Sequence, residues 1–110
     1  MKIRNLILAL IAIAAMSSCK SQYELLLNSN DADAKYKAAF EYFNNRKYSR
    51  AASLFESLSA LTDGTERDDT VRYYWGLSNY NFKDYYTAET NFEQFVESYP
   101  RSPFAEEARY

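Results

Sequence analysis

The sequence predicts an all-α fold built as a solenoid of helical hairpins, and two observations carry this prediction. From about residue 32 onward, apolar residues recur at the three- and four-residue spacing of a helix. One stretch of the chain is also repeated 37 residues further on, with Tyr48, Ala51, Phe55 and Leu58 returning as Tyr85, Ala88, Phe92 and Phe95. An internal repeat of this length is typical of helical arrays in which each unit packs on its neighbour.

Residues 1–18 have the layout of a secretory signal peptide. The first five residues carry two cations and no acid, and Leu6–Met16 is an uninterrupted apolar run of eleven residues. A membrane-spanning helix needs roughly 20 apolar residues, so this run is too short to cross a bilayer. We therefore expect residues 1–18 to be removed from the mature chain.

Cys19 is the only cysteine, and it directly follows Ser17 and Ser18. A cysteine in this place resembles the lipobox of bacterial lipoproteins, in which the thiol is acylated and becomes the first mature residue. The resemblance implies that Cys19 carries lipid and that residues 19–31 form a tether. An ordinary signal peptide with an unrelated cysteine is the alternative, because Met16 stands where such motifs usually have leucine.

The composition of the remaining 92 residues excludes several classes of function. They hold 11 Lys and Arg against 15 Asp and Glu, a net charge of −4 that does not favour nucleic acid as a partner. With no histidine, one cysteine and two glycines, the chain lacks the residues of nucleophilic triads, thiolate metal sites and phosphate loops. We interpret Glu89, Glu93 and Glu97 as a solvated helix face, and we predict no enzyme activity, cofactor or metal.

Start and stop signals divide the chain into four helices and the beginning of a fifth. Asp31 and Asp84 are predicted N-caps, Thr65–Asp68 fits a capping box, and Pro100 ends a helix. The expected helices are 32–43, 48–58, 66–82 and 85–99, with a short one from Phe104. The last helix reaches Tyr110 after barely two turns, so we expect a fragment or a longer array.

The spacing resembles the tetratricopeptide repeat, a helix–turn–helix unit of 34 residues, with three residues inserted between the copies. Repeat one is 32–65, repeat two is 66–102, and 103–110 begins a third. Ala39, Ala51, Gly76 and Ala88 stand where small residues let the helices approach each other. Asn79 departs from the aromatic residue of the pattern, and we expect Tyr80 to take over its contact.

Longer segments resemble the BamD family, lipoproteins that assist assembly of outer-membrane proteins. The resemblance rests on the tether from Cys19 and on residues 35–43, 47–56 and 99–108. It implies a non-enzymatic scaffold that faces the periplasm, is held at the outer membrane by acyl chains, and binds assembly components or unfolded outer-membrane proteins. One alternative is a glycan-binding nutrient lipoprotein whose tyrosines stack on sugar rings. The other is a periplasmic coordinator of cell division or peptidoglycan work, because the segment Tyr-Pro-x-Ser-Pro-x-Ala is shared among periplasmic repeat proteins.

The tetratricopeptide resemblance also places a groove for a peptide or partner on the first helix of each repeat. Tyrosine suits such a groove because it offers apolar area and a hydroxyl group at low entropic cost. The alternative is that these side chains simply pack against the following helices. The predicted groove residues are Tyr36, Phe40, Phe43 and Asn44 in the first copy, and Tyr73, Leu77, Tyr80 and Asn81 in the second.

Overall fold

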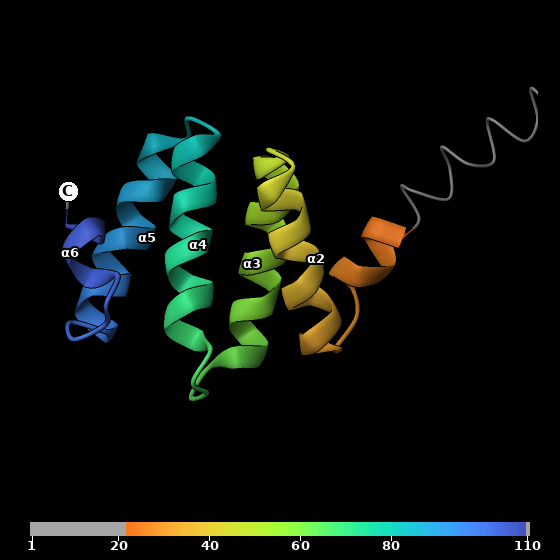
Figure 1. The fold of residues 1–110 in the computed structure, drawn as a ribbon, viewed down its shortest axis with the longest axis horizontal. Helices are drawn as coiled ribbons and strands as arrows, with labels where there is room; N and C mark the ends of the chain where they lie inside the picture. Colours follow the sequence, from red (N-terminus) through yellow and green to blue (C-terminus); the bar gives the residue numbers. More distant parts are fainter. Residues whose placement is uncertain (1–21, 110) are drawn as a thin grey trace, which may run out of the picture.

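The computed structural model describes residues 22–109, in which all regular structure is helical (Figure 1). The helices are α2 (Ala32–Asn44), α3 (Tyr48–Thr62), α4 (Asp68–Asn81), α5 (Tyr85–Ser98) and α6 (Ala105–Ala108). Residues 22–27 form a further helical segment before α2. The predicted all-α class is confirmed. The predicted signal peptide and Cys19 lie outside the described residues.

The helices stand side by side in a row and alternate in direction (Figure 1). Each packs mainly on the helix before it and the helix after it in the chain. Helices α2 and α3 form one hairpin, α4 and α5 form the second, and α6 begins beside α5. This sequential stacking is the helical-hairpin solenoid predicted from the repeat.

Two of the predicted helix starts are confirmed, and one is wrong. The carboxylates of Asp31 and Asp84 accept hydrogen bonds from backbone N–H groups three residues ahead, at 3.1 and 3.3 Å. The capping box at Thr65 does not form, because the hydroxyl group and the N–H of Thr65 both donate to the carbonyl of Thr62. Gly64, at a φ of 80°, closes this turn, and α4 begins only at Asp68.

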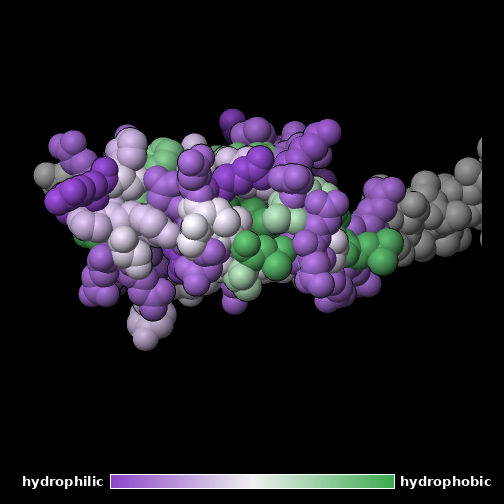
Figure 2. Space-filling view, turned by 90° about the horizontal axis from the view of Figure 1, so that it is seen from below, coloured by the Kyte–Doolittle hydropathy of each residue, from purple (hydrophilic) through white to green (hydrophobic). Residues whose placement is uncertain are grey.

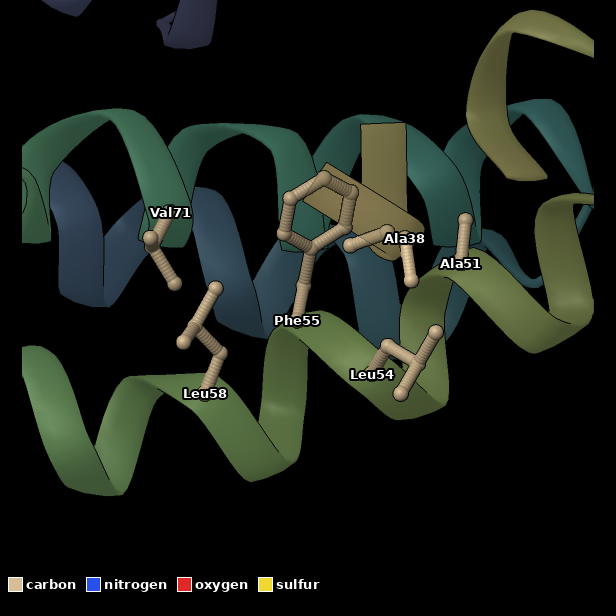
Figure 3. Packing of buried hydrophobic residues seen from close by; sticks show 7 residues of the cluster. Ala38, Ala51, Leu54, Phe55, Leu58 and Val71 are labelled. Carbon is tan, nitrogen blue, oxygen red and sulfur yellow. The ribbon is translucent and has the colours of Figure 1, made fainter. Parts of the chain in front are cut away.

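The first core cluster lies between α2, α3 and α4. Figure 3 shows Phe55 and Leu58 projecting from α3 toward α4, which contributes Val71. Ala39 and Ala51 are fully buried in the same cluster, where their small side chains allow α2 and α3 to approach closely. The repeat pattern therefore places its small and aromatic residues in the core of repeat one.

The second core cluster links α4 and α5 to α6. Tyr73 stacks on Phe104 with their ring centroids 4.6 Å apart, and Phe95 is fully buried beside it. Gly76 is buried on α4, where an added Cβ would lie 2.7 Å from the ring of Phe92. The small residue at this position therefore makes room for an aromatic ring of α5.

The expectation that Tyr80 takes over the aromatic contact of position 79 is wrong. Asn79 is buried, and its amide nitrogen donates to the side-chain oxygen of Asn91 at 2.8 Å, so the helices meet there through a satisfied polar pair. Tyr80 is 52% exposed and contacts Tyr85 of α5. Asn79 needs no aromatic substitute because a buried polar group with a partner carries no large penalty.

The helical segment at residues 22–27, inside the predicted tether, packs against repeat one. Tyr23, Leu26 and Leu27 are half-buried against the first core cluster. Ser57 donates a hydrogen bond to the carbonyl of Leu27 at 3.1 Å and accepts one from the amino group of Lys35 at 2.6 Å. Burial lowers the pKa of Lys35. Residues 22–27 of the predicted tether are thus packed on the solenoid.

Candidate binding groove

A groove of about 750 Å³ lies between α4, α5 and α6. A hollow of this volume is within the range that holds small ligands or parts of a peptide. Its apolar surface comes from Leu77 of α4 and from Ala88, Phe92 and Val96 of α5. Tyrosine rings add amphipathic surface, contributed by Tyr73, Tyr80 and Tyr85.

One side of the groove is strongly acidic. Glu89, Glu93 and Glu97 follow one another at four-residue intervals along α5, and all three are exposed and line the groove. Arg109 is the only cation among the lining residues. The sequence-based interpretation of these glutamates as solvated holds, but it missed that they border a hollow. The groove therefore favours a ligand that combines apolar surface with positive charge.

A partly buried hydrogen bond joins two residues that line the groove, Tyr73 and Glu107. The Tyr73 hydroxyl group donates to the carboxylate of Glu107 at 2.8 Å, which ties α4 to α6. Burial raises the pKa of Tyr73 to about 12, and the hydrogen bond and the charge of Glu107 act in the same direction. Tyr73 thus stays protonated at neutral pH and serves as a hydrogen-bond donor.

The structure brings only some of the predicted groove residues together. Tyr73, Leu77 and Tyr80 line the groove, whereas Asn81 does not. Phe40 and Phe43 instead lie 4.8 and 5.3 Å, centroid to centroid, from the ring of Tyr74 on α4. The two remaining residues also lie elsewhere, with Tyr36 beside Phe40 and Asn44 exposed at the end of α2.

Comparison of the two repeats explains this difference. The 37-residue offset relates Phe40, Phe43 and Phe55 to Leu77, Tyr80 and Phe92. In repeat one, Tyr74 from the following helix fits among these three rings, at 4.8, 5.3 and 6.1 Å. In repeat two, the corresponding residues line the groove. The groove is therefore the repeat-two copy of a surface on which repeat one already packs an aromatic side chain from a helix.

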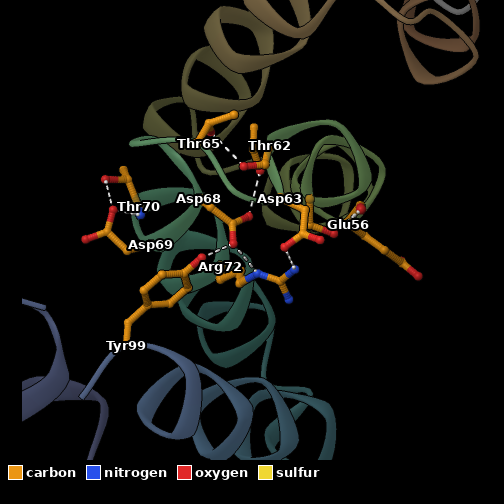
Figure 4. Close-up of polar contacts among 10 residues, drawn as sticks. Glu56, Thr62, Asp63, Thr65, Asp68, Asp69, Thr70, Arg72 and Tyr99 are labelled. Atoms are coloured by element: carbon orange, nitrogen blue, oxygen red, sulfur yellow. Dashed lines mark hydrogen bonds and ion pairs between the residues drawn. The ribbon is translucent and has the colours of Figure 1, made fainter. Parts of the chain in front are cut away.

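A buried polar cluster supports the base of α4 (Figure 4), and the sequence analysis included its central residue, Asp68, only as part of the predicted capping box. Asp68 is fully buried and accepts hydrogen bonds from Thr62 and Arg72, both at 2.8 Å, and from Tyr99. Burial alone would raise the pKa of Asp68, but these hydrogen bonds outweigh it and hold the pKa below its ordinary value. The cluster fixes α4 against α3 and the end of α5.

Within residues 22–109, no helix is both long enough and apolar enough to span a bilayer. The same residues contain no group of three or more histidine, cysteine or acidic side chains that could hold a metal ion.

The stacked hairpins define a helical-repeat protein with a tetratricopeptide-like hairpin fold. The family model YfiO, described as an outer membrane lipoprotein, matches residues 28–110, and the chain belongs to this family. Comparisons with curated proteins and with solved structures give no significant match. Family membership associates the chain with the outer membrane.

Proposed function

We propose that the protein is a lipid-anchored scaffold of the machinery that assembles outer-membrane β-barrels, as its resemblance to BamD implies. The observation that carries the proposal is the family match over residues 28–110, which covers both hairpins and the groove. In this proposal Cys19 holds the acyl chains, the solenoid faces the periplasm, and the groove binds assembly partners or unfolded barrel segments.

The chemistry of the groove supports an unfolded barrel strand as ligand. Strands of outer-membrane barrels alternate apolar and polar side chains over about ten residues and carry aromatic residues near their ends. Such a segment can place apolar side chains against Leu77 and Phe92 while a basic side chain reaches the row of glutamates. Tyr80, which is half-exposed, supplies an aromatic contact at the edge.

The groove proposal predicts that Tyr80→Ala combined with Glu93→Lys weakens binding of such a peptide about 10-fold or more, because aromatic anchors and charge pairs carry much of the energy of an interface. The probe is a labelled ten-residue peptide with alternating apolar and polar residues, one lysine and a terminal phenylalanine. Fluorescence anisotropy with the full chain measures its affinity.

The matched control combines Tyr86→Ala with Glu56→Lys. Tyr86 is 84% exposed and lies outside the groove, and Glu56 is the exposed repeat-one counterpart of Glu93. The control is expected to bind like the parent, and both variants should melt at the parent temperature because the four side chains are largely exposed. Equal affinities in the two variants would remove the groove from the proposal.

The lipid anchor is tested separately at Cys19. We expect mass spectrometry of membrane-extracted protein to show Cys19 as the acylated first residue, because the apolar run and the two serines immediately precede it. Stable attachment needs more than one acyl chain. Cys19→Ser should abolish the acylated form. An unmodified Cys19 thiol in protein extracted from the membrane would contradict the lipoprotein assignment without bearing on the groove.

A further inference from the structure

One edge of the solenoid is formed by the α2–α3 turn and the α4–α5 turn, and we call residues 44–50 and 80–87 the turn edge. Both turns lie at the same end of the helices, at the top of Figure 1. They are also neighbours, because a shallow hollow of about 360 Å³ is lined by Arg46–Arg50 of the first turn and by Phe82 of the second. The two turns therefore present one continuous surface.

The turn edge gathers most of the exposed large apolar side chains in the described part of the chain. Five such residues are more than half exposed in residues 22–109, and four of them belong to the α4–α5 turn: Tyr80, Phe82, Tyr85 and Tyr86. The fifth, Leu25, belongs to the helical segment before α2. A cluster of exposed aromatic rings is unusual for a free surface and indicates an interaction site.

Charge is distributed unevenly between the two edges. The turn edge carries four cations, Arg46, Lys47, Arg50 and Lys83, and one acid, Asp84. The opposite edge, residues 31–35, 62–69 and 97–102, carries seven acids and three bases. Figure 2, which looks onto this opposite edge, shows hydrophilic residues around a hydrophobic patch near the middle of the face. The solenoid thus has a basic, aromatic end and an acidic end, although the chain as a whole has a net charge of −2.

Backbone geometry sets two of these cations apart. Arg46 and Lys83 have φ angles of 61° and 71°, in the left-handed region that glycine adopts without a steric penalty. They occupy the same position in the two repeats, 37 residues apart, directly after the cap of the first helix. Both turns therefore keep a cation at a strained position, which favours a role for the charge beyond closing the turn.

We infer that the turn edge is a membrane-binding face for an anionic phospholipid surface. Tyrosine and phenylalanine rings enter the headgroup region of a bilayer, and nearby lysine and arginine side chains are attracted to anionic lipids. The family is one of outer membrane lipoproteins, so a bilayer is within reach of the chain. The inference concerns the orientation of the solenoid; Tyr80 and Tyr85 belong to both the groove and the turn edge, whereas the four cations of the turn edge lie outside the groove.

This contact fixes a geometry that an acyl anchor alone would leave open. With the turn edge on the bilayer surface, the helix axes are roughly perpendicular to the membrane and the acidic edge points away from the lipid. Helix α4 ends and α5 begins at the turn edge, so both helices that line most of the groove point away from the bilayer. The groove between α4, α5 and α6 then faces along the membrane surface and not into it.

The test compares fluorescent labels at the two edges. Full-length chain with Cys19→Ser receives an environment-sensitive label on either Ser49→Cys, which is exposed on the turn edge, or Glu66→Cys, which is exposed on the opposite edge. The protein is mixed with vesicles of phosphatidylethanolamine and phosphatidylglycerol. We expect the label at position 49 to shift to the blue and to be protected from an aqueous quencher, and the label at position 66 to remain in water.

A second variant keeps the test independent of folding. Arg46→Gly with Lys83→Gly removes two cations and suits the left-handed backbone, so this variant should melt at or above the parent temperature. We expect loss of the blue shift at position 49 in this variant and on vesicles of phosphatidylcholine alone. The inference is overturned if the labels at 49 and 66 behave alike, or if the glycine variant keeps the full shift.

Discussion

Replacement of Phe55 by alanine is expected to destabilise the fold by about 3–5 kcal/mol, the range found when a buried phenylalanine is truncated. Phe55 is fully buried between α2, α3 and α4. Its ring lies 5.1 Å from that of Phe40 and 6.1 Å from that of Tyr74. Truncation would leave a cavity surrounded by packed side chains that have little room to relax. Urea unfolding followed by circular dichroism measures the change.

Phe92→Ala is the matched control, because Phe92 is the same residue at the same position of the second repeat. Its ring is only partly buried and borders the groove, so truncation removes less buried area and leaves space that is open to water. We expect a clearly smaller loss of stability than for Phe55. Equal losses in the two variants would show that the two repeats are enclosed alike, contrary to the structure.

The parts of the fold that local rules determine are the parts that the sequence predicted well. Helical spacing located all four long helices, and Asp31 and Asp84 cap helices as expected, since a cap depends on only three or four neighbouring residues. Thr65 fails as a cap because it is used in a tight turn with Thr62. All three positions hold a residue type that commonly caps helices, and the conformation of the adjoining loop decides which of them does so.

The groove was predictable only in part, because the repeat pattern is nearly the same in both copies while the surroundings differ. Periodicity assigns Phe40 and Leu77 to equivalent places, yet Tyr74 covers the first and not the second. The 37-residue offset places the counterpart of Tyr74 at position 111, outside the described residues. The sequence shows the row of Glu89, Glu93 and Glu97, but the tetratricopeptide resemblance placed the groove on the first helix of each repeat, and α5 is a second helix.

Asp68 was missed for a related reason. An acid in the first turn of a helix is adequately explained by the helix dipole, so the sequence gives no reason to look further. Its partner Tyr99 lies 31 residues away, beyond the reach of any local rule. The hydrogen bond that the Tyr99 hydroxyl group donates to the Asp68 carboxylate, together with burial, raises the pKa of Tyr99 to about 12. At neutral pH Asp68 is therefore ionised and Tyr99 is protonated, so that Tyr99 can donate its hydrogen bond to the carboxylate.

Asp68→Ala is expected to cost about 3 kcal/mol of stability at neutral pH, because removal of one partner of a buried ion pair leaves the other without compensation. Arg72 would lose the carboxylate at 2.8 Å, and Thr62 and Tyr99 would lose their acceptor. Asp33→Asn is the matched control. Asp33 forms an ion pair of similar length with Arg67, at 2.6 Å, but the side chain of Asp33 is 85% exposed. Exposed pairs contribute little, so this variant should unfold like the parent.

The pH dependence of stability separates lost charge from lost packing in the Asp68 variant. Because the folded-state pKa of Asp68 lies below its ordinary value, its contribution is fully present above the unfolded-state pKa and is lost as pH falls through the folded-state pKa. The parent should therefore lose stability on acidification below about pH 4, and Asp68→Asn, which nearly preserves the shape of the side chain, should lose less over the same range. Urea unfolding at a series of acidic pH values measures both slopes. Parallel slopes for the parent and Asp68→Asn would contradict an ionised carboxylate at the centre of the cluster.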